Sequence, residues 1–273
     1  MKETVFRRTE RNYLNIPELY SHRQLLYYFV WRELKARYKQ TALGVLWVVL
    51  QPLAMVTIFS VFISQLGRGS GTEVPYFIFV YTGLLFWNLF SSIAGRVSNS
   101  IVANASVIRK IYFPRLFPAL TNVAVSFVDF LATLLVFIVI LLVTQTGIQI
   151  EGIFFAFFAL FLTIISSLGF GLMMSAINVK YRDVNHAMPF IIQAWFFLTP
   201  IIYPLSVVPE SIKALTFLNP MTGVVSFMRH FLFDTGSNID AWWLMISALS
   251  GVAMFAAGLT YFLRKEPSLP EKL

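Results

Sequence analysis

Six stretches of this 273-residue chain contain no charged side chain, and each is long enough to cross a lipid bilayer. A helix needs roughly 20 consecutive apolar residues to span the hydrocarbon core. Barrel strands are shorter and alternate in polarity, so runs of this length predict helices whose backbone satisfies itself in lipid. The stretches are Gln40–Gly67, Val74–Gly95, Phe130–Ile150, Gly152–Val179, Val184–Pro209 and Ala241–Leu263.

The composition agrees with a chain surrounded mostly by lipid. Hydrophobic residues make up 58% of it and charged residues only 12%, which is too little polar surface for a soluble domain of this size. Cysteine is absent, and this excludes disulfides, thiolate metal sites and a cysteine nucleophile.

The net charge is +8, and the basic residues are distributed along the chain in a pattern that indicates its membrane topology. Of the 21 Lys and Arg, all but Arg68, Lys213 and Arg229 precede the first apolar stretch or follow the second, fourth and sixth predicted spans. Basic residues are retained on the cytoplasmic side of a membrane. The pattern therefore predicts that both termini are cytoplasmic, and it explains the charge without a nucleic-acid partner.

The stretch from Ala187 to Thr235 makes the number of spans ambiguous. It is apolar enough for two spans, but a second span there would place the basic C-terminal tail outside. We therefore expect one span followed by two short helices, near Glu210–Phe217 and Thr222–Phe233, that re-enter the outer leaflet. The residues that interrupt a continuous helix are Pro200, Pro204, Pro209, Asn219 and Pro220.

The chain is thus predicted to be an all-α polytopic membrane protein. Its single six-span transmembrane domain covers residues 40–265, with the re-entrant outer helix pair at about 204–236. Residues 1–20 and 266–273 are expected to be cytoplasmic tails. The expected spans are Leu43–Leu66, Tyr76–Arg96, Pro118–Thr144, Ile153–Val179, Ala187–Tyr203 and Ala241–Leu263.

Residues 21–39 predict an amphipathic helix before the first span. Aromatic and apolar side chains recur at spacings of three and four, and basic side chains occupy the rest, which is typical of a helix lying in the membrane interface. A plain membrane anchor is the alternative. The apolar face consists of Tyr27, Val30, Trp31, Leu34 and Tyr38.

Two predicted spans carry polar stripes. Asp129 is the only acidic residue well inside a span, and an ionisable group in lipid normally faces a partner or a cavity. A hydrated conduit and simple hydrogen bonding between two helices explain the stripes equally well. The stripes are Asn88, Ser92, Arg96 and Asn99 on the second span and Asn122, Ser126, Asp129 and Thr133 on the third.

On the fourth span, small residues recur every fourth position at Ser167, Gly171 and Ser175, which predicts close packing against another helix.

Motifs that carry chemistry are missing from the sequence. It contains no Gly-Lys pair and hence no phosphate-loop nucleotide site. Its three histidines, His22, His186 and His230, lack the spacing of metal ligands. We therefore expect no catalytic residue, no metal site and no cofactor in this chain.

Several segments, taken in their order along the chain, resemble one family. They read Arg32-Glu-Leu-Lys-Ala-Arg-Tyr-Lys39, Leu43-Gly-Val-Leu-Trp47, Gln51-Pro52, Tyr112-Phe-Pro114, Tyr181-Arg-Asp183, Leu198-Thr-Pro-Ile-Ile-Tyr-Pro204 and Leu218-Asn-Pro-Met221. Together with six spans they resemble the permease subunits of ATP-binding-cassette exporters for bacterial surface polysaccharides such as O-antigen, capsule or teichoic acid. The resemblance covers about residues 20–265.

The resemblance implies a homodimer in the bacterial cytoplasmic membrane, with two separate ATP-binding subunits on its cytoplasmic side. ATP and Mg²⁺ would be bound by those partners. A lipid-linked polysaccharide would pass through a channel between the protomers. The implied ATPase-coupling residues are Val107, Ile108, Arg109, Lys110, Ile111, Tyr112 and Phe113 of a coupling helix, with Arg182 and Asp183 of a second short loop.

The same resemblance assigns three further sets of residues. The interface helix would lie across the ATPase and the pore entrance through Trp31, Arg32, Glu33, Lys35 and Arg37. Channel-lining candidates are the aromatic residues Trp47, Phe59, Phe62, Trp195, Phe196 and Tyr203, because aromatic faces suit sugar rings. Asp129 is a further candidate, because its polar stripe could line a hydrated conduit. The outer helix pair would close the channel through Pro204, Pro209, Asn219, Pro220 and Arg229.

Other functions fit parts of the same pattern. An exporter permease of this architecture for a drug or a small lipid would have equally long, aromatic-rich spans. An integral membrane enzyme of glycan assembly would need carboxylates or basic groups that converge at one membrane face. A secondary transporter would need more buried acids than Asp129 alone.

Overall fold

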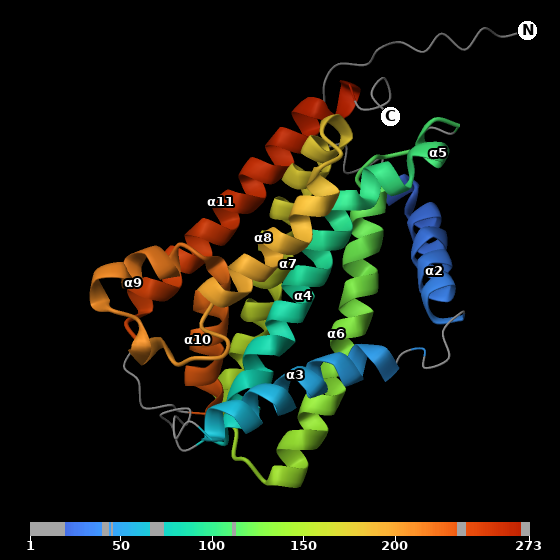
Figure 1. Ribbon diagram of the computed structural model, residues 1–273. Coiled ribbons are helices and arrows are strands. Elements are labelled where there is room, and N and C mark those ends of the chain that lie inside the picture. Colours follow the sequence, from blue (N-terminus) through green and yellow to red (C-terminus); the bar gives the residue numbers. More distant parts are fainter. Residues whose placement is uncertain are drawn as a thin grey trace, which may run out of the picture.

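The computed structural model describes residues 20–39, 44, 46–65, 74–110, 113–233 and 239–268. Within these residues every regular element is helical (Figure 1). The expectations for residues 1–19, for Ile111 and Tyr112 and for residues 269–273 lie outside the described part of the chain.

Four helices of the described chain are long and apolar enough to cross a membrane. They are α4 (Tyr76–Ala103), α6 (Phe117–Thr144), α7 (Ile150–Lys180) and α11 (Ala241–Lys265). They match the predicted second, third, fourth and sixth spans, and run roughly along one direction in Figure 1.

The segments predicted as the first and fifth spans form apolar helices that fall short of the four candidate spans, α3 (Leu46–Gln65) and α8 (Val184–Leu198). In Figure 1, α3 crosses α4 and α6 at a steep angle instead of running beside them, which the sequence did not indicate. The α8 helix ends before Pro200, because proline disfavours helical geometry in the residue before it.

The centre of the molecule is α4. Of its most apolar stretch 78% is buried, against 28–39% in the other three long helices. Large side chains such as Phe86, Phe90 and Trp87 pack inward from it, and α3, α6, α7, α8 and α10 (Pro220–Phe233) contact it. This central helix contributes polar side chains to both cavities described below.

Small residues bring α7 close to its neighbours. A Cβ atom on Gly171 would lie 2.7 Å from the Val97 side chain, so the predicted packing role of the small-residue stripe is confirmed against α4. The closest approach was not predicted. A Cβ on Gly258 of α11 would lie 1.9 Å from the backbone oxygen of Gly169, so no side chain fits at that crossing.

Two short helices follow α8, as the sequence predicts: α9 (Glu210–Phe217) and α10, which begins two residues before the expected Thr222. A 3-10 turn, η1 (Leu205–Val207), precedes them. The Asn219 amide explains the sharp joint between α9 and α10, because its oxygen accepts the Met221 N–H at 3.0 Å and its nitrogen donates to the Thr199 hydroxyl at 2.8 Å.

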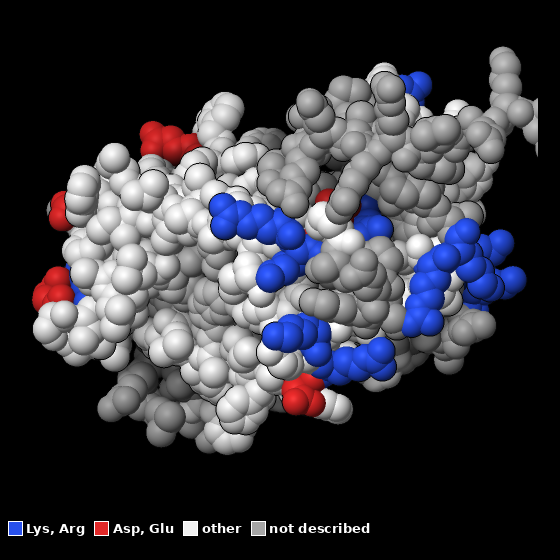
Figure 2. Space-filling view, turned by 90° about the horizontal axis from the view of Figure 1, so that it is seen from above, with Lys and Arg blue, Asp and Glu red and all other residues white. Residues whose placement is uncertain are grey.

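One end of the helix bundle is basic. The short helix α5 (Ala105–Ile108), the connection between α7 and α8, and η2 (Glu266–Ser268) all lie at this end in Figure 1. Figure 2 views the molecule from this side and shows Lys and Arg gathered there. We refer to it as the basic end.

Candidate functional site

The predicted interface helix is α2 (Arg23–Lys39), and it runs beside the first half of α6. Near the middle of α2 the centroid of the Phe29 ring lies 5.4 Å from that of Phe113, and near the C-terminal end of α2 Arg37 reaches Asp129. Its buried contact residue, Phe29, is not on the face that the sequence pattern predicts.

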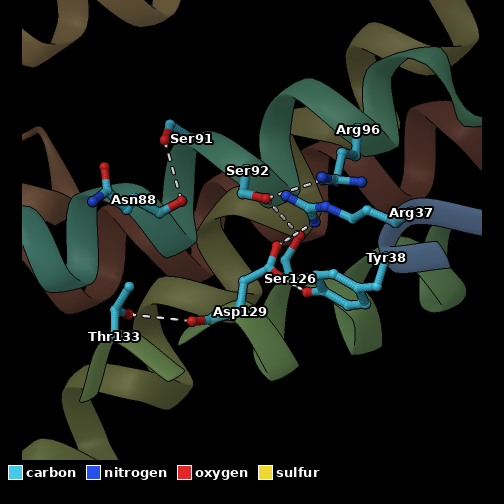
Figure 3. Close-up of polar contacts among 9 residues, drawn as sticks. All are labelled: Arg37, Tyr38, Asn88, Ser91, Ser92, Arg96, Ser126, Asp129 and Thr133. Atoms are coloured by element: carbon cyan, nitrogen blue, oxygen red, sulfur yellow. Dashed lines mark hydrogen bonds and ion pairs between the residues drawn. The ribbon is translucent and has the colours of Figure 1, made fainter. Parts of the chain in front are cut away.

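The Asp129 carboxylate is held by two residues of α2 (Figure 3). Arg37 Nη1 donates to Oδ2 and the Tyr38 hydroxyl donates to Oδ1. Burial and the hydrogen bond to Asp129 raise the pKa of Tyr38 to about 12, so the phenol stays protonated and donates at neutral pH. Each carboxylate oxygen of this buried acid thus accepts a hydrogen bond from a neighbouring helix.

The two polar stripes on α4 and α6 do face each other. The hydroxyl oxygens of Ser92 and Ser126 lie 2.8 Å apart, and Arg96 Nε donates to Ser92 Oγ at 3.1 Å. The sequence did not indicate that the partners of Asp129 come from α2 and not from the opposite stripe.

A cavity of about 240 Å³ lies beside this cluster. Residues of α2, α3, α4 and α6 form its wall. The lining residues are Arg37, Val48, Gln51, Pro52, Asn88, Leu89, Ser91, Ser92, Ser126, Asp129, Phe130 and Thr133.

A second cavity, of about 410 Å³, lies nearer the basic end between α2, α4 and α6. Arg32, Glu33 and Arg96 bring charge to it. The remaining lining residues are Phe29, Gly95, Asn99, Ser100, Ala103, Asn104, Pro118, Thr121 and Asn122.

The aromatic candidates for channel lining divide into two groups. Trp47 and Phe62 are 57% and 65% exposed on α3. Trp195 and Phe196 instead pack against other helices of the chain, and the Trp195 ring centroid lies 5.1 Å from those of both Phe90 and Phe170, on α4 and α7. The ring centroids of Phe59 and Phe196 lie 6.4 Å apart. The Tyr203 hydroxyl donates a hydrogen bond to the Phe197 carbonyl at 3.1 Å.

The implied coupling residues gather at the basic end. Arg109 and Lys110 follow α5 and are exposed, as are Arg182 and Asp183 before α8. Phe113 is buried at 3% exposure against Phe29, so it fixes the segment to α2 and does not project outward. Among the interface-helix residues, Trp31, Arg32 and Lys35 are also exposed.

Arg229 on α10 is buried, with 4% of its surface exposed, and it joins three segments. Its guanidinium donates to the carbonyl oxygens of Phe79, Pro200 and Ile201 at 3.0, 2.6 and 2.6 Å. Its Cζ also lies 3.5 Å from the centroid of the Phe79 ring. The sequence identified Arg229 as an outer residue of interest, but its three partners could not be read from any local pattern.

The described residues contain no group of three or more His, Asp or Glu side chains able to hold a metal ion. The long apolar helices and the polar cluster between them define an integral membrane protein of several spans. Comparison with known proteins then gives the family.

Residues 24–233 match the ABC-2 type transporter family, and the chain belongs to it. It is 29% identical over 253 residues to the O-antigen export system permease protein RfbA of Myxococcus xanthus, covering 92% of this chain and 96% of that relative. A Klebsiella pneumoniae protein of the same name is 28% identical, with coverages of 85% and 88%. The polysialic acid transport protein KpsM of Escherichia coli is 25% identical, with coverages of 82% and 89%. The chain is accordingly a transport subunit.

Proposed function

We propose that this chain is the channel-forming subunit of an ATP-driven exporter that moves a lipid-linked polysaccharide, of the O-antigen or capsule type, across the bacterial cytoplasmic membrane. The observation that carries this proposal is its similarity, over most of both chains, to permeases named for O-antigen export and for polysialic acid transport. These two cargoes share a chemical class, a long hydrophilic sugar chain.

In this proposal all six apolar helices span the membrane and the basic end is cytoplasmic. The gathering of Lys and Arg at one end supports that orientation. A second copy of the chain supplies the other wall of the channel, which gives the exposed apolar side chains of α3 a protein neighbour. Trp47 and Phe62 are exposed in the single chain, and in the homodimer they form part of the channel wall, where sugar rings can contact them.

Two ATP-binding subunits dock on the basic end in the same proposal. Arg109 and Lys110 after α5, with Arg182 and Asp183 before α8, supply exposed charges for that contact. The buried Phe113 of the coupling segment packs against Phe29 of α2. A movement of α5 caused by the ATP-binding subunit is therefore transmitted to the interface helix. ATP hydrolysis with Mg²⁺ takes place in those subunits.

The outer gate is formed in this proposal by α9 and α10. Pro209 and Pro220 start these helices, and Asn219 fixes the joint between them. Arg229 connects α10 to α4 and to the segment that follows α8, so the gate moves with the helix that carries Trp195 and Phe196.

Deletion of the gene in its own organism tests the cargo. The expected result is loss of surface polysaccharide with accumulation of lipid-linked polymer in the cytoplasm, both reversed by the intact gene. Normal surface polysaccharide combined with new sensitivity to a drug would contradict the proposal and favour a drug or small-lipid exporter. Loss of polymer synthesis itself, with nothing accumulating, would favour an enzyme of glycan assembly.

A further inference from the structure

One buried amide joins three helices at the basic end. Asn178 lies on α7, two residues before that helix ends, and its exposed fraction is 0%. Its Nδ2 donates to the Ser98 carbonyl oxygen of α4 at 3.0 Å and to Asn185 Oδ1 of α8 at 2.8 Å. These partners lie 80 and 7 positions away in the sequence, so the three-way contact arises only when the chain folds.

The two acceptors determine how the Asn178 amide is used. A backbone carbonyl only accepts hydrogen bonds, so the nitrogen of the amide must be the atom that faces Ser98. A primary amide has two N–H groups, and each of the two neighbours takes one of them. The Asn178 Oδ1 accepts no hydrogen bond from the described residues. Asn178 therefore links α4 and α8 by donation alone, which a carboxylate of the same shape cannot do.

The acceptor on α8 belongs to the first turn of a helix with little buried surface. Of the 15 residues of α8, only Met188 and Phe196 are buried. Asn185 is exposed, and its side-chain oxygen reaches Asn178. Few buried contacts leave a segment free to open locally. The hydrogen bond from Asn178 therefore has a large share in holding the start of α8 against α7 and α4.

This link lies directly behind an exposed loop. Residues 181–183 alone separate α7 from α8, and Arg182 and Asp183 are the exposed charges that the proposed function assigns to an ATP-binding subunit. The Asn185 N–H donates to the Arg182 carbonyl oxygen at 3.2 Å, so the loop continues into the first turn of α8. A movement of the loop therefore reaches Asn185 and, through Asn178, the backbone of the central helix α4.

We propose that Asn178 is a positioning residue, which makes α4, α7 and the start of α8 move as one unit when an ATP-binding subunit moves the α7–α8 loop. Asn178 touches neither cargo nor ATP in this arrangement, and its effect is to keep ATP hydrolysis and polymer movement in step. The role in transport rests on the proposed function. The link among the three helices rests on the contacts of Asn178 alone.

The first measurement uses the chain assembled with its ATP-binding subunit in proteoliposomes, and it gives the polymer transported per ATP hydrolysed. Asn178→Asp keeps the shape of the side chain and loses both donors. Asn185→Leu removes the acceptor on α8, whereas Asn185→Asp keeps an oxygen that accepts the same hydrogen bond. His186→Leu is the matched control, because it removes a neighbouring exposed polar side chain that forms no hydrogen bond to α7 in the described structure.

Asn178→Asp should lower the polymer transported per ATP by about 2–30-fold while ATP hydrolysis continues. Asn185→Leu should lower it by about 2–10-fold, because one of the two hydrogen bonds remains. Asn185→Asp and His186→Leu should match the intact chain. A residue that only packs would change the yield of folded complex and leave this ratio as it is. Because Asn185 is exposed, its two variants keep the test usable if Asn178→Asp does not fold.

The second measurement does not depend on the cargo. The chain has no cysteine, so introduced cysteines can be spin-labelled without background. Ala103→Cys on α4 and Ala187→Cys on α8 place both labels at exposed positions of the assembled complex, and labelled chains are diluted with unlabelled ones so that each distance lies within one chain. The distance distribution should stay the same when a non-hydrolysable ATP analogue is added. Asn178→Asp should broaden or shift it.

The proposal is overturned if Asn178→Asp leaves the distance distribution of the intact chain, or if Asn185→Leu and Asn185→Asp give the same transport ratio. Where the intact complex transports polysaccharide and either of these results is obtained, only this inference fails. Where the intact complex moves no polysaccharide while the distances respond to Asn178→Asp as expected, only the proposed function fails.

Discussion

Arg37 of α2 and Asp129 of α6 lie 92 positions apart in the sequence and form the one ion pair that joins two helices in the described part of the chain. The pair connects the interface helix to the middle of a membrane-spanning helix. It therefore couples any movement of α2 to the polar cluster between α4 and α6. Its loss should be felt in both stability and transport.

Asp129→Asn keeps the shape of the side chain but removes the charge that Arg37 faces. The expected loss of stability is about 1–3 kcal/mol, below the about 3–5 kcal/mol of a fully buried pair, because the Arg37 side chain is 30% exposed. Thermal unfolding of the purified protein measures it. Asp183→Asn, which changes an exposed acid, should be neutral.

A double-mutant cycle isolates the pair itself. Arg37→Gln combined with Asp129→Asn should cost less than the sum of the single changes, with a coupling of about 0.5–3 kcal/mol. Strict additivity would show that the two side chains do not act together.

Gly258→Ala should drive α7 and α11 apart, since its Cβ would lie 1.9 Å from the Gly169 backbone oxygen. We expect a net cost of about 1–3 kcal/mol from overpacking, even though alanine is the better helix former. Gly147→Ala is the matched control, because its Cβ would meet no atom within 4 Å. Equal unfolding temperatures for the two variants would show that α7 and α11 do not pack as described.

The four long spans could be predicted from the sequence because each contains a long charge-free run. The starts at Tyr76 and Ala241 agree with α4 and α11 to the residue. Position along the chain does not reveal how helices cross. The steep crossing of α3 and the placement of α2 beside α6 therefore appear only in three dimensions.

The candidate site, too, could be predicted only in part. An acid inside a span must have a partner, so Asp129 and the facing stripes could be recognised from polarity and helical period alone. Its partners could not, because Arg37 and Tyr38 are ordinary members of a basic amphipathic segment.

Arg229→Lys tests the connection between the outer helix pair and the rest of the molecule. A single ammonium cannot reach the carbonyls of Phe79, Pro200 and Ile201 with the geometry of a guanidinium. Leaving buried acceptors unpaired should cost about 2–4 kcal/mol in thermal unfolding. Gly83→Ala should act in the same direction, because its Cβ would lie 2.7 Å from Arg229 Nη2. A lysine variant as stable as the wild type would refute the role of this residue.

Charge reversal at the basic end tests the proposed ATPase contact. The double change Arg109→Glu and Lys110→Glu should weaken capture of the co-expressed ATP-binding subunit by about tenfold or more, while thermal unfolding of the chain is unchanged because both side chains are exposed. Arg264→Glu serves as the control for charge alone. Undiminished capture by the double variant would place the contact elsewhere.

The most direct test of the central claim is transport itself. The chain is reconstituted with its ATP-binding subunit into proteoliposomes whose outer leaflet carries the lipid-linked polysaccharide, and polymer protected inside the vesicles is measured over time. Protected polymer that rises with ATP and Mg²⁺, and stays at background with a subunit unable to hydrolyse ATP, is the predicted result. Polymer that remains outside while the complex hydrolyses ATP would contradict the claim that this chain forms the channel for polysaccharide.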